Sequence, residues 1–171
     1  MTDLSDLVQV IPLALGSSVL GGLLTAGIAG LRESAGKRRE GYALATRTLV
    51  ARAEYPYRVR RRTSDNAETL TSLAKLGSDL QEQLAASRIW VGTESPRLGK
   101  IYVQTVTDID AAVGPATQDA WSLPPITSGN QMNLNGWGPG GSPHDHITAF
   151  ERAVRWRFGI RRLVPFAPRC P

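Results

Sequence analysis

The stretch "DNAETLTSLAKLGSDLQEQLAASRIWVGTESP" (residues 65–96) carries one helical pattern between a start signal and a stop signal. Its small and apolar side chains recur at alternating spacings of three and four residues, at Leu70, Leu73, Gly77, Leu80, Leu84 and, further on, Val91. Such spacing places one stripe on a single helical face. Asp65 followed by Glu68 resembles a capping box. The stretch therefore predicts an amphipathic helix over residues 65–91.

A second helix is predicted directly after this one. Ser95 can cap a helix that starts at Pro96, where the missing backbone N–H costs little. The helical period then runs to Trp121 through Leu98, Tyr102, Val106, Ile109, Val113, Ala116 and Ala120. The segment "IYVQTVT" (residues 101–107) also has the β-branched composition of a strand, but the continuing period favours a helix. Pro115 is expected to kink it.

Another helix is predicted upstream. Its apolar face is formed by Tyr42, Thr46, Leu49 and Ala53. This helix is expected to run from about residue 8 to residue 54. "YPY" at residues 55–57 is expected to end or kink it, because Pro56 disfavours a helical conformation at Tyr55. In an antiparallel bundle, the acidic helices that follow can face this basic first helix.

Residues 7–31, "LVQVIPLALGSSVLGGLLTAGIAGL", contain no ionisable side chain. As a helix they would span ~37 Å, enough to cross the ~30 Å hydrocarbon core of a bilayer. The acidic "MTDLSD" (residues 1–6) disfavours a cleaved signal peptide. Five glycines disfavour a buried core or oligomeric helix. The sequence predicts a single transmembrane helix.

Basic residues follow this apolar run and only acids precede it; the basic residues are Arg32, Lys37, Arg38 and Arg39. The positive-inside rule places residues 1–6 outside the cell and the C-terminal region in the cytoplasm. The four basic side chains are expected at the membrane interface, in contact with anionic lipid. The predicted fold is all-α: a transmembrane helix (residues 7–31) that continues into a small cytoplasmic bundle of three to four helices, mainly within residues 32–121.

A seam of small side chains recurs every fourth residue along the predicted span, at Ala14, Ser18, Gly22, Ala26 and Gly30. In lipid, helices associate by close packing, which small residues four apart permit. The seam predicts self-association into a homo-oligomer. The alternatives are a seam for a different membrane partner and a small pore.

Residues 122–143 break the helical periodicity and are rich in glycine and proline. They predict a long irregular connection with the character of a flexible linker. Trp137 at its centre is expected either to fold onto the bundle as a latch or to contact a partner. A closing basic amphipathic helix is predicted over residues 144–159, and residues 160–171 form a tail rich in proline and arginine.

The formal net charge of +5 is distributed unevenly. Residues 32–62 carry +7 and residues 122–171 carry +4, whereas residues 63–121 carry −4. Much of this charge can be satisfied within the chain, so the high pI alone is a weak indication of a nucleic-acid partner. Arginines beside aromatic side chains are nevertheless candidates for contact with an anionic partner; they are Arg58, Arg60, Arg61, Arg62, Arg152, Arg155 and Arg157.

The chain offers few groups for chemistry. "HDH" at residues 144–146 contains both histidines, but residues two apart on a helix point to different faces and cannot ligate one metal ion. Asp108 and Asp110 are interpreted as solvated helix positions, and Cys170 lies next to the C-terminus. The sequence contains no Gly-x-Ser-x-Gly motif. We therefore expect no catalytic site, no cofactor and no metal site.

Together these patterns predict a self-associating, single-pass membrane protein whose helical bundle binds an unknown protein partner. It would act as a scaffold, adaptor or assembly component and not as an enzyme. The first alternative is a membrane-tethered protein that binds nucleic acid through its arginine clusters. The second is a membrane-disrupting effector or small pore.

Overall fold

The computed structural model describes residues 35–158. Within this range the regular structure is entirely helical, which confirms the predicted all-α class for these residues. The helices are residues 35–60, α2 (Ala67–Glu94), α3 (Pro96–Ser122), the short 3-10 helix η1 (Gly129–Gly136) and α4 (Pro143–Phe158). The chain divides into two compact units, Met1–Glu40 and Gly41–Pro171. The helical bundle belongs to the second unit.

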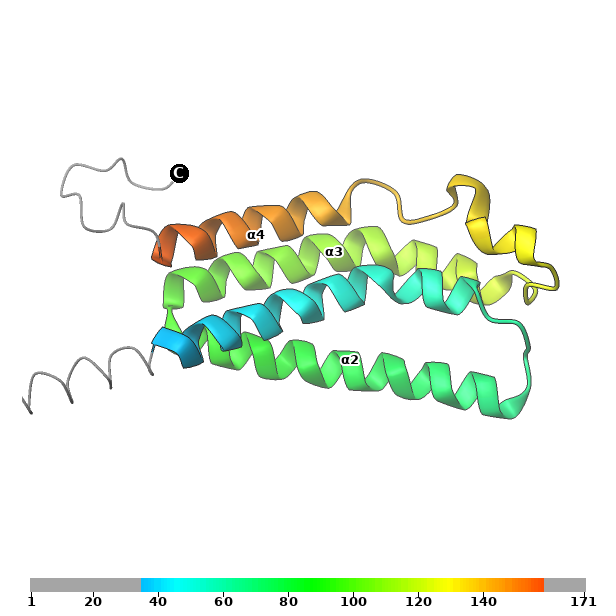
Figure 1. The fold of residues 1–171 in the computed structure, drawn as a ribbon, viewed down its shortest axis with the longest axis horizontal. Coiled ribbons are helices and arrows are strands. Elements are labelled where there is room, and N and C mark those ends of the chain that lie inside the picture. The colour runs from blue at the N-terminus through cyan, green and yellow to red at the C-terminus, as the bar shows by residue number, and fades with distance from the viewer. Residues whose placement is uncertain (1–34, 159–171) are drawn as a thin grey trace, which may run out of the picture. The chain divides into compact units, whose positions relative to one another are not determined.

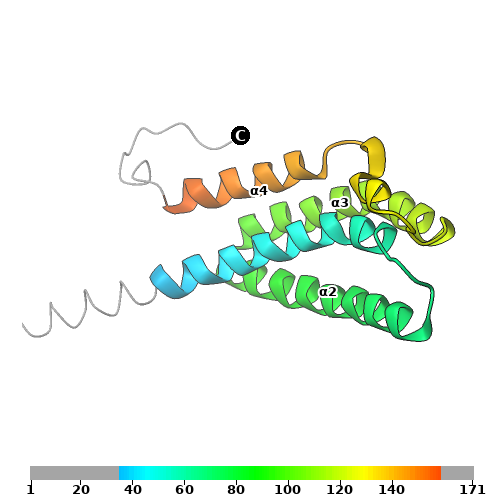
Figure 2. The same cartoon turned by 45° about the vertical axis from the view of Figure 1, so that its right-hand side comes forward.

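The long helices of this unit follow one another in antiparallel directions. In both views of the bundle, α3 lies between α4 and the helix of residues 41–60, and α2 lies on the other side of that helix (Figures 1 and 2). Ser95 is the single residue between α2 and α3. Its backbone N–H donates to the carbonyl of Val91 at 2.9 Å, and its side chain accepts from the N–H of Leu98. One serine therefore caps both helices, and the predicted start of a helix at Pro96 is confirmed.

The main core contains apolar side chains from all four long helices. Its members are Tyr42, Ala45, Leu49, Ala53, Leu84, Val91, Leu98, Tyr102, Ile109, Val113, Ile147 and Phe150. Many of them belong to the stripes predicted from spacing. The rings of Tyr102 and Phe150 pack edge to face with centroids 5.3 Å apart, which ties α4 to α3. The segment "IYVQTVT" is helical, as its position within the apolar period predicted.

A second cluster, built on Tyr55, Val59, Leu80 and Ala120, stabilises the other end of the bundle. The ring of Tyr55 packs against Gly77, where an added Cβ would lie 2.8 Å from the Tyr55 hydroxyl. That hydroxyl donates to the carbonyl of Leu73 at 3.1 Å. Gly77 therefore belongs to the apolar stripe because it leaves room for an aromatic ring.

The prediction that residues 55–57 end the first helix is wrong, since the helix continues through Pro56 to residue 60. Proline removes one backbone hydrogen bond, but Pro56 and Val59 are fully buried, and burial of apolar surface offsets that loss. The start of the next helix also differs from prediction. Asn66 caps α2, and its side chain accepts from the N–H of Thr69 at 2.8 Å. The Asp65 carboxylate does not cap the helix; it accepts a hydrogen bond from Nε of Arg62 at 2.6 Å.

The predicted membrane location is corrected. Among the helices of residues 35–158, none is long and apolar enough to cross a bilayer. Each keeps a polar or charged face alongside its apolar face, as in the pairing of Arg52 with Asp110 at 2.7 Å. The predicted span itself, residues 7–31, lies outside the described residues.

The glycine- and proline-rich connection is more ordered than predicted. It contains η1, and Ile126 is buried with its backbone N–H donating to the carbonyl of Arg62 at 2.8 Å. Leu134 and Asn135 adopt positive φ angles of 56° and 44°. The carbonyl of Leu134 accepts from the N–H of Trp137 at 2.8 Å. Local turns of this kind therefore give the connection its order, although its sequence has no helical periodicity.

The Tyr102 hydroxyl gives a pH-dependent prediction. It is fully buried beside Ser87, without a hydrogen-bond partner of good geometry among residues 35–158. Burial raises the pKa of Tyr102 from 10.0 to about 12, and the Ser87 side chain lowers it in part. A raised folded-state pKa means that ionisation favours the unfolded chain. Stability present below pH 10 is therefore lost as the pH rises from 10 to about 12, by about 2–3 kcal/mol.

Tyr102→Phe is expected to remove this loss. At pH 7 the variant should be within about 1 kcal/mol of the parent, because the deleted hydroxyl makes no well-formed hydrogen bond. Urea unfolding of both proteins at pH 7 and pH 11 measures the difference. An identical decline in both proteins would contradict the assignment to Tyr102.

Candidate functional site

A groove of about 390 Å³ runs between the helix of residues 41–60 and α2. We name it the apolar groove; it is lined by Gly41, Leu44, Thr48, Gln83, Ala86, Ser87 and Trp90. None of these side chains ionises near neutral pH. The groove therefore offers shape and apolar surface rather than acid–base chemistry.

Small residues on the facing helices create this groove. The Trp90 ring lies directly against Gly41, where an added Cβ would overlap it. Tyr42 fixes that ring from the core side, edge to face at 5.0 Å. The Thr48 hydroxyl donates to the carbonyl of Leu44 at 3.0 Å, so its polar atom is satisfied within its own helix. The Leu44 side chain is 56% exposed.

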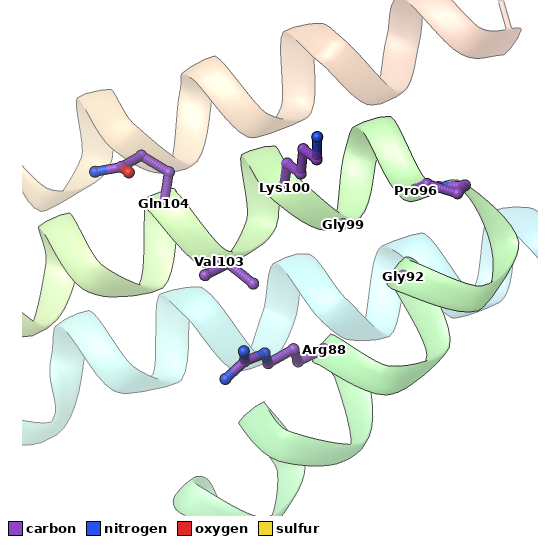
Figure 3. A pocket seen from close by; sticks show the side chains of 7 residues that line it. All are labelled: Arg88, Gly92, Pro96, Gly99, Lys100, Val103 and Gln104. Atoms are coloured by element: carbon purple, nitrogen blue, oxygen red, sulfur yellow. The ribbon is translucent and has the colours of Figure 1, made fainter.

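A second hollow of about 370 Å³ lies where α2 and α3 approach each other near Ser95. We name it the basic notch; its lining residues, drawn in Figure 3, are Arg88, Gly92, Pro96, Gly99, Lys100, Val103 and Gln104. An added Cβ at Gly99 would lie 2.7 Å from the Cα of Gly92, so the helices meet here at bare backbone. An added Cβ at Gly92 would meet nothing within 4 Å. This hollow was not predicted from the sequence, because glycines on either side of the Ser95 turn look ordinary in it.

The two hollows lie on opposite sides of α2. Successive helical residues are rotated by about 100°, so Gln83 and Trp90 point about 170° away from Arg88 and Gly92. The buried face of α2 lies between these two directions on the inner side. Ile89, which is 71% exposed, lies between them on the outer side. A ligand in one hollow therefore leaves the other accessible.

Arg62 is one of the arginines predicted to contact an anionic partner, and the structure buries it at 6% exposure. Its Nε donates to Asp65 at 2.6 Å. Its four remaining N–H groups have carbonyl acceptors, namely those of Val59, Ala120, Trp121 and Leu123. A guanidinium has five N–H donors, and all five are used here. Arg62 therefore has no donor left for an external anion.

The other members of its cluster lie nearer the surface. Arg58 and Arg61 are exposed, and Arg60 is half-buried. Arg60 donates to the carbonyl of Pro124 at 3.1 Å, and Arg61 donates to that of Met132 at 3.3 Å. These two arginines thus contact the connection that contains η1.

The arginines of α4 form a separate group. Arg152 is exposed, Arg155 pairs with Glu151 at 3.3 Å, and Arg157 pairs with Glu94 at 2.7 Å. The end of α4 lies beside Tyr42, because the Phe158 and Tyr42 rings pack at 5.6 Å. Arg58 lies sixteen residues further along that helix, a rise of ~24 Å. The structure therefore places the two arginine clusters at opposite ends of the bundle.

Trp137 lies against the second cluster. Its Nε1–H donates to Asp119 at 2.6 Å, and its ring packs edge to face on Tyr57 at 5.8 Å. Gly138 follows at a point where an added Cβ would overlap the Tyr57 hydroxyl. Trp137 therefore packs on the bundle, and its role as a latch or as a partner contact stays a prediction.

The histidines face different helices. His144 lies 3.8 Å from Glu54, and His146 lies 3.5 Å from Asp108. Within residues 35–158, no three His, Cys, Asp or Glu side chains gather into a metal-binding group.

The remaining predicted residues lie at the N-terminus. The small-residue seam (residues 14–30) and Arg32 fall outside the described residues. Lys37, Arg38 and Arg39 are exposed on the first described helix.

The fold and its surface define an antiparallel helical bundle with two hollows on either side of one helix. No family model, no curated protein and no solved structure matches this chain. Its function is therefore inferred from its own geometry.

Proposed function

We propose that this chain is a non-catalytic helical binding module, acting as a scaffold or adaptor, whose apolar groove takes up an amphipathic helix of a partner protein. The observation that carries the proposal is the groove between residues 41–48 and residues 83–90, with Leu44 exposed at its rim. Its volume of about 390 Å³ is comparable to that of a ligand site.

The arrangement of the lining residues favours a helical ligand. Each wall presents residues spaced three, four and seven apart on one helix face, which is the ridge pattern that a third helix packs into. Small side chains such as Ala86 and Ser87 let another backbone approach. An amphipathic helix that lays its apolar face into a groove of this kind gains affinity from a few anchoring side chains. Sites for small molecules depend instead on several convergent polar groups.

Photo-crosslinking can identify the partner in the host cell. A photoreactive residue at Ala86, which is exposed in the groove, should give a discrete protein adduct. The same residue at Gln118, which is exposed on α3 outside the groove, should not. The adduct is identified by mass spectrometry, and the partner is purified for titration.

Leu44→Arg is expected to weaken binding of that purified partner by about tenfold to a hundredfold, since it replaces a leucine contact with a charge. Val50→Arg is the matched control, because Val50 is an exposed apolar residue of the same helix that does not line the groove. Equal affinity of Leu44→Arg and the parent would contradict the proposal. Circular dichroism checks that both variants remain folded.

A further inference from the structure

We propose that the basic notch is a second docking surface and that it binds an acidic helix of a protein partner. This inference goes beyond the apolar groove, because the notch lies on the opposite side of α2 and has different chemistry. It would make the chain a two-sided adaptor.

The first observation is the positive charge at the notch. Arg88 and Lys100 project from α2 and α3 at its borders (Figure 3), and both are exposed. Neither has a hydrogen bond or ion pair within residues 35–158. Other basic side chains within residues 35–158 do reach carboxylates, among them Arg52, Arg62, Lys75, Arg155 and Arg157.

This absence of local acids is informative because the surrounding sequence is acidic. Residues 63–121 carry a net charge of −4. The acid at the end of α2, Glu94, is bound by Arg157 at 2.7 Å. No acidic side chain lines the notch. The chain thus leaves two cations beside a hollow without neutralising them, which favours a ligand with carboxylates.

The floor of the notch indicates how such a ligand fits. Gly92 and Gly99 expose backbone, and Val103 and Pro96 add apolar surface. An apolar side chain of an approaching helix can contact this floor while carboxylates one turn away reach Arg88 and Lys100.

Other occupants fit less well. No aromatic ring lines the notch, so nucleic-acid bases have nothing to stack on, and two cations contact few phosphates. A second copy of the chain in a two-fold dimer would bring cations against cations, because the same surface meets itself.

The first experiment selects ligands without presuming their sequence. Displayed libraries of helix-forming peptides are selected on the full chain, with soluble Gly92→Leu protein present as competitor. The Cβ of a leucine at this position meets nothing within 4 Å, so the side chain has room to enter the notch, and circular dichroism checks that the competitor is folded. It also gains helix propensity over glycine. We expect the enriched peptides to contain several-fold more Asp and Glu than the library. No enrichment, or enrichment without excess acid, would overturn the proposal.

The second experiment titrates an enriched peptide against charge variants. Arg88→Glu combined with Lys100→Glu is expected to weaken binding by about tenfold or more. Arg58→Glu combined with Arg152→Glu makes the same change in net charge at other exposed sites, and binding should stay within about twofold. An equal loss in both double variants would show non-specific attraction and overturn the proposal.

Two further titrations separate the remaining possibilities. Leu44→Arg should bind the notch peptide as the parent does, so failure of the apolar groove proposal and failure of this one are distinguishable. A single-stranded oligonucleotide that displaced the peptide at equal or lower concentration would reassign the notch to nucleic acid and overturn the protein partner.

Discussion

Arg62→Ala is expected to destabilise the fold by about 3–5 kcal/mol, the largest effect of any single charged residue described here. The guanidinium joins the end of the first helix to the end of α3, where it donates to the carbonyls of Ala120, Trp121 and Leu123. A positive charge at a helix C-terminus also interacts favourably with the helix dipole. Its position 5.5 Å from the Trp121 ring adds a cation–π contact. Alanine would leave buried carbonyls without donors, and each such loss costs about 1–3 kcal/mol.

Urea unfolding of the full chain measures this effect, with two controls. Arg61→Ala makes the same change in charge one residue away, but Arg61 is exposed with one bond of 3.3 Å to Met132, so the loss should be below about 1 kcal/mol. Arg62→Lys keeps the charge and loses the planar fork, so its stability should fall between those of the parent and Arg62→Ala. Equal stabilities of Arg61→Ala and Arg62→Ala would show that the buried network contributes little.

The helices were the predictable part of the fold. Alternating spacings of three and four residues along residues 70–91 and 98–120 predicted which faces meet in the core. The Ser95 cap with Pro96 behind it predicted the α2–α3 turn because capping is a local interaction. Local rules failed where distant residues intervene. Burial of Pro56 and Val59 carries the first helix past residue 55.

The candidate surfaces were less predictable because each depends on two helices that approach at a particular register. Composition marked Arg62 as one of four similar arginines, yet contacts with α3, some sixty residues away in sequence, bury it. The glycines of the basic notch are ordinary within α2 and α3 taken alone. In the packed helices, a Cβ added at Gly99 would lie 2.7 Å from the Cα of Gly92. Only this close approach shows why Gly99 carries no side chain.

Phe150→Ala is expected to cost about 3–5 kcal/mol, because Phe150 is fully buried and its loss leaves a cavity against Tyr102. The effect should concentrate on α4 (Pro143–Phe158). A helix of 16 residues is marginal by itself, so its order depends on packing through Phe150 and Ile147. Hydrogen exchange should show α4 amides losing more protection than those of α2 and α3.

Phe150→Leu keeps an apolar side chain in the same space and should lose only about 1–1.5 kcal/mol. A Phe150→Ala chain that unfolded in one step with uniform loss of protection would instead show α4 to be inseparable from the rest of the bundle. In that case the hydrogen bonds and ion pairs of α4, such as Arg157 with Glu94, would hold it to the bundle without the aromatic contact.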